Sequence, residues 1–329
     1  MKLITAIFLL AAALFSVANA DSSFTKGKYP DFDKLVNGYV DRDLEIDADI
    51  APTLTSARDA YSAELDKIID GYNDKQRPDE AEKIQKEVER FHRNGLKGYP
   101  SDEQPTAVKI AWSDMLRTVE QAEKEVRPRR QKIRNLFLRA LGGIESSFRE
   151  AKDGEGLALA GKARACVSIR DLIEDDRLAE TKIYGESKNP WRDVANQGGY
   201  IVGFETSTGQ WWQHQVLGEM KPIFETLDGP TEGARRGGGS GEVTLAKEGY
   251  AVGGLSIRSG DVVNAVQIIF MRINPDGMSL DTKDSYRSEW LGGKGGGKPN
   301  DIDSRGHLIV GVTGKTGDII DGLGLVYLR

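Results

Sequence analysis

The chain has 329 residues, a formal net charge of −6, a single cysteine and 38 glycines. This charge excludes the strongly basic surface that attracts nucleic acid or an anionic membrane. One cysteine also excludes internal disulfides, and the length is typical of about two domains.

The first twenty residues have the pattern of a secretory signal peptide. Lys2 precedes an apolar run at 3–17, and the small residues Ala18 and Ala20 close the segment. The run is shorter than the ~20 residues that a membrane-spanning helix needs. We therefore expect cleavage after Ala20 and a mature protein that is secreted, periplasmic or at the cell surface.

Residues 21–50 are expected to form an extended lead-in. At 41–50 acidic residues alternate with other residues, which is the period of a half-buried strand or an extended arm. The alternating acids are Asp41, Asp43, Glu45, Asp47 and Asp49. A cation site is the alternative interpretation, but side chains along an arm need not converge, so a solvated strand edge is favoured.

Residues 51–175 have the apolar period of long helices. Apolar residues recur at steps of three and four, as in Tyr61, Leu65, Ile68 and Tyr72, and in Trp112, Met115, Val119, Ala122 and Val126. Such narrow seams predict a helical hairpin or coiled-coil region, closed within the chain or across a homo-oligomer. Pro128 predicts a kink or a short interruption near Val126. Cys166 is interpreted as a small apolar residue on a helix face rather than a reactive thiol.

The apolar period stops at 176–196, which we interpret as a linker. From 197 to 329 the chain is glycine-rich, with short apolar runs between turn signals, which is typical of an all-β sandwich, barrel or prism. Three stretches, 200–209, 251–260 and 308–317, each reach a glycine that is followed by another glycine six positions later. This internal repeat predicts three equivalent strand–turn–strand units.

The last repeat and the strand after it resemble a known family. Residues 307–329 read HLIVGVTGKTGDIIDGLGLVYLR, an apolar strand, a G-x-x-x-D loop and a final strand. This segment resembles the closing segment of jacalin-like lectin domains, with Gly317 and Asp321 in the two named positions. The earlier repeats and the glycine-rich 292–297 fit the threefold plan of that family, the β-prism. The resemblance covers roughly the final 130 residues and implies a prism of three Greek-key-like sheets at 197–329. Together with the helices predicted from the apolar period at 51–175, the fold class is an α + β multidomain protein.

The resemblance also implies a carbohydrate site at the third loop. A carboxylate such as Asp321 can accept hydrogen bonds from two neighbouring sugar hydroxyls. The family plan places backbone N–H donors at Asp318 and Ile319, and Gly317 lets the backbone approach the ligand. Such a site needs no metal. The alternative is that Gly317 only forms a turn and Asp321 bonds its own loop.

The other two repeats keep less of this motif. The second has Gly260 and Asn264, whose amide accepts hydrogen bonds without charge, and the first has Gly209 and Gln213. We therefore expect one intact site and a weaker second candidate at Gly260 and Asn264.

Two further features near the repeats have alternative interpretations. Trp211 and Trp212 are adjacent, so on a strand one enters the core and the other points outward, where it packs against the helices or stacks on a sugar. The acidic residues Asp276, Asp281 and Asp284 could attract Ca²⁺, but their spacing is not that of an EF-hand loop, and a solvated loop is favoured.

Catalytic motifs are missing from the sequence. The three histidines lie in different contexts, and neither a G-x-S-x-G elbow nor a phosphate-binding loop is present. We expect a non-enzymatic protein without cofactor that binds a glycan or polysaccharide, with the helices as spacer or oligomerisation region. The alternative is a structural or adhesive scaffold whose prism contacts other proteins.

Overall fold

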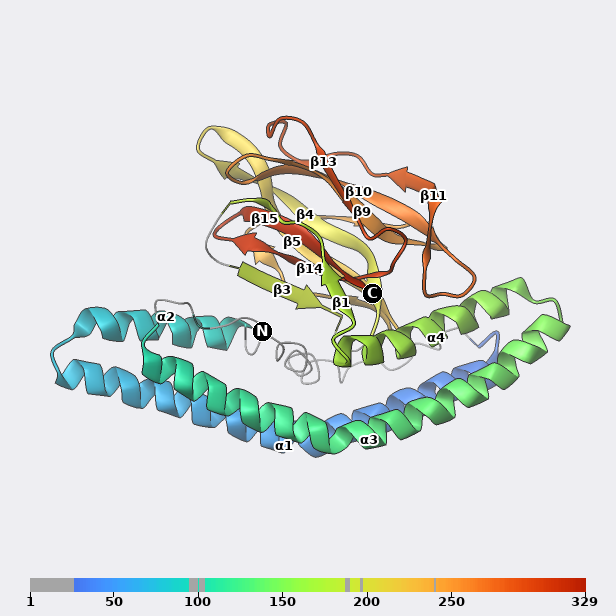
Figure 1. The fold of residues 1–329 in the computed structure, drawn as a ribbon, viewed down its shortest axis with the longest axis horizontal. Helices are drawn as coiled ribbons and strands as arrows, with labels where there is room; N and C mark the ends of the chain where they lie inside the picture. The colour runs from blue at the N-terminus through green and yellow to red at the C-terminus, as the bar shows by residue number, and fades with distance from the viewer. Residues whose placement is uncertain (1–26, 95–99, 101–103, 187–189, 196–197, 240) are drawn as a thin grey trace. The chain divides into compact units, whose positions relative to one another are not determined.

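The computed structural model describes residues 27–94, 100, 104–186, 190–195, 198–239 and 241–329 (Figure 1). The predicted signal peptide at 1–20 lies outside these residues. The chain divides into two compact units. One contains Asn37–Arg139, and the other contains Ala140–Arg329 together with the described residues before 37.

Within the described residues, four helices precede the strands: α1 (Pro30–Asp74), α2 (Pro78–Asn94), α3 (Thr106–Glu150) and α4 (Gly154–Glu174). The predicted apolar seams of α1, α2 and α3 form one buried cluster. At its centre the ring of Tyr61 meets those of Phe91 and Trp112 edge-on, with centroids 4.8 and 5.4 Å away. None of the described helices is both long and apolar enough for a membrane span.

The helix α3 continues through Pro128. A short interruption near Val126 is therefore not found. Val126 and Arg130, on either side of the proline, are both buried, so packing against neighbouring helices holds this turn in helical form.

The extended conformation expected for 41–50 is wrong, because these residues lie within α1. In a helix, Asp43 and Asp47 are one turn apart and share a face. Both carboxylates face the guanidinium of Arg130 on α3: Asp47 binds it directly, and Asp43 Oδ1 lies 3.9 Å from Nη1. Acidic residues at every second position are also found at every fourth position. The pattern at 41–49 therefore fits one face of a helix as well as one face of a strand.

The strands form three antiparallel sheets of five strands each in the described part of the chain. Each sheet is built on one long hairpin. These hairpins are β4 (Tyr200–Trp211) with β5 (His214–Thr226), β9 (Tyr250–Ser259) with β10 (Val263–Ile273), and β14 (Ile309–Thr316) with β15 (Ile320–Leu328). Apolar side chains from all three hairpins meet in one core. The predicted β-prism after an all-helical region is confirmed.

Shorter strands complete each sheet in the same way. The first hairpin is followed by β6 (Gly229–Glu232), β7 (Arg236–Gly237) and β8 (Glu242–Leu245), and the second by β11 (Leu280–Arg287), β12 (Leu291–Gly292) and β13 (Asn300–Asp303). In both sheets the first two short strands pair with the returning hairpin strand and the third pairs with the outgoing one.

The short strands that pair with the third hairpin come from the beginning of the domain, before β4. They are β1 (Leu178–Glu180), β2 (Tyr184–Gly185) and β3 (Pro190–Val194), which pair with β15, β15 and β14. Residues 176–196, interpreted as a linker, instead supply three strands of this sheet. Strands of two to five residues carry too little periodicity to be recognised.

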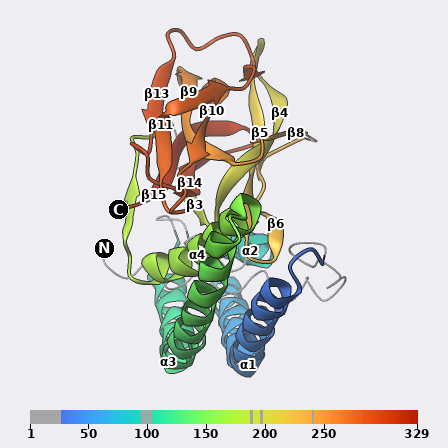
Figure 2. The ribbon, with the colours of Figure 1, turned by 90° about the vertical axis from the view of Figure 1, so that its right-hand side faces the viewer.

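The helix α4 packs on the prism within the second unit, and Figure 2 shows it beneath the strands. The carboxylate of Asp153 caps the helix by accepting the N–H of Gly156 at 3.0 Å. The backbones approach closely: a Cβ at Gly198 would lie 2.2 Å from the carbonyl oxygen of Cys166. Cys166 is buried, in agreement with its interpretation as a small apolar residue.

Candidate functional site

Each of the three hairpins has a β-bulge at the same place. On each returning strand one residue is skipped by the pairing near the turn, as the register of the neighbouring pairs shows. The skipped residues are Gly218 in β5, Asn264 in β10 and Asp321 in β15. A bulge takes its residue out of the register between the two hairpin strands and re-aims the side chain. The three bulges therefore identify the equivalent positions of the three repeats.

A glycine from a short strand lies against each bulge. These glycines all have positive φ: 76° at Gly237, 99° at Gly292 and 106° at Gly185. A Cβ would fall 2.0, 2.7 and 2.0 Å from the carbonyl oxygens of Gly218, Asn264 and Asp321, respectively. Any side chain at these glycines would force the two backbones apart, so they set the shape of each loop pair.

The third loop places the Asp321 carboxylate beside Gly317. Asp321 Oδ2 lies 3.5 Å from the position that a Cβ at residue 317 would take. The N–H of Gly317 donates to the carbonyl of Ile319 at 3.2 Å, and Thr316 Oγ1 donates to the same carbonyl at 2.8 Å. Among the described residues, neither the N–H of Asp318 nor that of Ile319 donates to a backbone carbonyl. The predicted acceptor and the two predicted donors therefore share one short loop.

The ends of the three hairpins are tied together by a small apolar cluster. The buried residues Val216, Val262 and Ile319 each stand two positions before a bulge and pack together, with Trp211 against them. The side chain of Ile319 thus anchors the third loop to the other two repeats. This arrangement fixes the backbone on which Asp318 and Asp321 lie.

The second loop has the same backbone but a different side chain. The N–H of Gly260 donates to the carbonyl of Val262 at 3.1 Å, as Gly317 does to Ile319. The amide nitrogen of Asn264 lies 2.9 Å from the position of a Cβ at Gly295. The weaker second candidate therefore holds a neutral amide that lies against the glycine-rich 292–297.

The first loop is the least similar of the three. The pairing aligns Gly218, not Gln213, with Asp321, because Gln213 lies in the turn between β4 and β5. The expected correspondence of Gln213 with Asp321 is therefore wrong. The β4–β5 hairpin is longer than the other two, and this extra length places the equivalent position at Gly218. The distance in sequence from Gly209 does not reveal the extra length.

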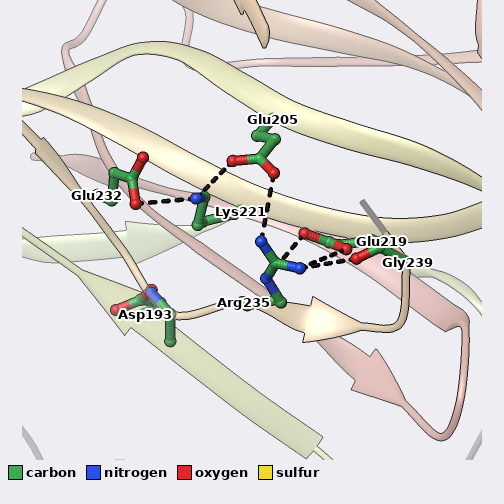
Figure 3. Close-up of polar contacts among 8 residues, drawn as sticks. Asp193, Glu205, Glu219, Lys221, Glu232, Arg235 and Gly239 are labelled. Carbon is green, nitrogen blue, oxygen red and sulfur yellow. Dashed lines mark hydrogen bonds and ion pairs between the residues drawn. The ribbon is translucent and has the colours of Figure 1, made fainter. Parts of the chain in front are cut away.

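An ionic network occupies the region next to Gly218 (Figure 3). Arg235 lies between two carboxylates: its Nε is 3.1 Å from Glu219 Oε1 and its Nη2 is 3.3 Å from Glu205 Oε1. Lys221 binds Glu205 and, at 2.8 Å, Glu232. Glu219 is fully buried, and burial raises the pKa of its carboxyl above the ordinary value. Because these carboxyl groups already pair with Arg235 and Lys221, the network has a structural role rather than one in ligand binding.

The acidic residues expected to form one solvated loop do not do so, because Asp281 and Asp284 lie in β11 and only Asp276 lies in the turn before it. Their carboxylates have structural roles. Asp276 accepts the N–H groups of Met278 and Ser279, and Asp284 pairs with Arg272 at 2.6 Å. Within the part of the chain that the structure describes, no group of three or more His, Cys, Asp or Glu residues could hold a metal ion.

A search of solved structures matches part of the chain to jacalin-related lectins. The mannose-specific lectin of Morus nigra is 19% identical over 46% of this chain and 96% of its own, with a TM-score of 0.34. The mannose-binding lectin of champedak is 18% identical over 46% and 97%, with a TM-score of 0.35. Malaysian banana lectin is 15% identical over 46% and 98%, with a TM-score of 0.33. No family model and no curated protein matches the chain.

The C-terminal strands form a jacalin-like β-prism. This assignment of the fold rests on the three sheets and the three bulged hairpins.

Two residues that shape the third loop, Thr316 and Gly185, were not predicted from the sequence. The hydroxyl of Thr316 donates a hydrogen bond across the loop to the carbonyl of Ile319. A hydroxyl residue next to a turn glycine is a sequence signal that could have predicted this role. Gly185 lies against the Asp321 carbonyl but comes from a segment with no strand pattern. Only its pairing in the folded sheet reveals it.

Proposed function

We propose that this protein is a non-enzymatic carbohydrate-binding protein whose sugar site is the loop of Gly317, Asp318, Ile319 and Asp321. The observation that carries the proposal is the position of the Asp321 carboxylate, at a bulge and 3.5 Å from the side-chain position of a glycine. A charged acceptor next to an uncovered backbone suits a ligand that presents several adjacent hydroxyl donors. The lectins named above are described as mannose-specific or mannose-binding, so mannosides belong among the first ligands to test.

Substitution of Asp321 distinguishes a sugar-binding protein from the alternative, a scaffold whose prism contacts other proteins. An array of neutral and acidic glycans is probed with the wild type, with Asp321→Asn and with Asn264→Ala. The proposal requires wild-type binding that Asp321→Asn reduces at least about tenfold, since a charge-assisted hydrogen bond becomes a neutral one. Asn264→Ala retains the binding. An array on which the wild type binds nothing, or on which Asp321→Asn binds equally, rejects the sugar site.

We propose further that the protein is exported and that the helical unit multiplies or spaces the prism. The support for export is the signal-peptide pattern at 1–20. The support for a spacer is the length of α1 and α3, which have 45 residues each. Linked weak sites gain avidity. Mass spectrometry of the mature N-terminus tests cleavage after Ala20, and light scattering of the purified protein tests oligomerisation.

A further inference from the structure

The β4–β5 hairpin extends beyond the other two. Its pairing continues past Gly209 and Val216 to Trp211 and His214, where the other hairpins have already turned. Trp212 lies in this turn and is 82% exposed. Trp is enriched at binding interfaces, because its ring offers a large apolar face and its N–H a polar handle.

The turn that carries Trp212 is supported by contacts with its neighbours. Trp212 has a φ of 53°, and its carbonyl accepts the amide N–H of Gln210 at 3.0 Å. Its ring meets that of Trp211 edge-on, with centroids 6.1 Å apart. Trp211 in turn packs on the cluster of Val216, Val262 and Ile319. The exposed ring is therefore presented by a supported turn, and little ordering is needed when a ligand binds.

The base of this hairpin lies between the two candidate loops. On one side, a Cβ at Gly209 would be 3.2 Å from Cγ2 of Ile319, in the Asp321 loop. On the other side, a Cβ at Gly293 would be 1.7 Å from the carbonyl oxygen of Gln215. Gly293 belongs to the glycine-rich segment beside Asn264. The hairpin therefore rises next to the Asp321 loop rather than from a remote edge.

The chemistry of the tip suits an uncharged sugar. Residues 208–217 contain no Asp, Glu, Lys or Arg. Three exposed amides, Gln210, Gln213 and Gln215, lie in the same segment as the two indoles, together with the exposed His214. An indole face offers apolar contact to the C–H face of a pyranose, and amides can both donate to and accept from its hydroxyls. A membrane-surface anchor would pair its aromatic residues with Lys or Arg, which this tip lacks.

We propose that Trp212 is the stacking platform for a second sugar residue, so that the ligand is an uncharged oligosaccharide whose first residue is held at Asp321. This inference rests on the proposed function. Asp321 then determines whether sugar binds, and Trp212 determines how affinity grows with chain length.

The test measures affinity against chain length with the full mature chain. Neutral mannose, glucose and galactose oligosaccharides of one to five residues are titrated into the wild type, Trp212→Ala, Trp212→Phe and Asp321→Asn. Val243→Ala is the matched control, because Val243 is also an exposed apolar residue of the prism, at 55% exposure. Far-UV circular dichroism confirms that each variant is folded.

In the wild type, affinity is expected to rise from one sugar residue to three. In Trp212→Ala this rise is lost, so that the trisaccharide binds about three- to tenfold more weakly, as the typical worth of an aromatic contact implies. Binding of the single residue stays unchanged, and Trp212→Phe restores part of the loss. Asp321→Asn weakens every chain length.

The inference is overturned if Trp212→Ala binds every chain length as the wild type does while Asp321→Asn does not. It is also overturned if Trp212→Ala abolishes binding to neutral phosphatidylcholine vesicles but leaves the length dependence intact. If the wild type binds no sugar, or Asp321→Asn binds normally, the proposed function itself fails, which is a distinct result.

Discussion

Gly317 and Asp321 lie side by side in the third loop, so that a side chain at position 317 would contact the Asp321 carboxylate. Asp321 Oδ2 lies 3.5 Å from the point where a Cβ at residue 317 would stand. At this distance a side chain at 317 would be in van der Waals contact with the carboxylate, and Gly317 itself is exposed.

Substitution of this glycine should therefore remove sugar binding and spare the fold. We expect Gly317→Val to weaken glycan binding at least about tenfold, because the valine methyl groups would shield the carboxylate. Gly260→Val is the matched control, since Gly260 occupies the same position of the second loop and a Cβ there meets nothing within 4 Å. Calorimetric titration measures the glycan affinity of the Gly317→Val and Gly260→Val variants. Equal affinity of the two variants would contradict the role given to Gly317.

The buried Glu219 should make stability depend on pH. Burial raises the pKa of its carboxyl in the folded state above the unfolded value. The folded state therefore favours the protonated form, and this contribution is complete below the unfolded pKa and lost as pH rises through the folded pKa. We expect the stability of Glu219→Gln relative to the wild type to increase as pH rises above the unfolded pKa of about 4.3.

Urea unfolding at several pH values measures this dependence. Glu232→Gln is the control, because that carboxylate is largely exposed and its pair with Lys221 is of the kind that contributes little. A constant difference between Glu219→Gln and the wild type across this pH range would contradict the prediction.

Cys166 should be unreactive in the folded protein. Burial raises the pKa of its thiol to about 12, and the thiolate is the reactive form. At pH 8 a thiol reagent should label the chain only at the rate of unfolding. Because the folded pKa exceeds the unfolded one, stability should also fall as pH rises above the unfolded value of about 8.5. The chain has one cysteine, so the signal is unambiguous. Stoichiometric labelling of native protein within minutes would refute the prediction.

Arg130 should be the ionic residue on which the helical unit depends most. Its side chain is 5% exposed and faces the carboxylates of Asp43, Asp47 and Glu123. Arg130→Met would leave buried carboxylates without a cation and should destabilise the unit by about 3–5 kcal/mol. Arg129→Met is the control, because Arg129 pairs with Asp49 at the surface, and its loss should change stability by less than about 1 kcal/mol. Urea unfolding followed by circular dichroism compares the two variants, and similar destabilisation would exclude this role.

The sequence was most informative where a signal is local. Glycine spacing identified the three repeats, and it placed Gly317 in the turn before the last strand, β15, which contains Asp321. The alternation around Asp43 and Asp47 was misread because it fits a strand and a helix face equally, and the deciding partner, Arg130, is more than eighty residues away.

The remaining errors depend on tertiary pairing. The strands at 178–194 are too short to show a pattern, and they become strands only by pairing with β14 and β15. The alignment of Gly218 with Asp321 required the bulge, which is defined by two strands together. The same holds for Gly185, whose place against Asp321 no sequence distance indicates.

The central claim concerns one carboxylate. A glycan selected on the array is titrated by calorimetry into the wild type and into Asp321→Asn, which keeps the shape of the side chain and removes its charge. We predict one strong site in the wild type and an affinity at least about tenfold lower in Asp321→Asn, as loss of a charge-assisted hydrogen bond implies. Equal affinity of the two proteins would contradict the claim that Asp321 holds the sugar.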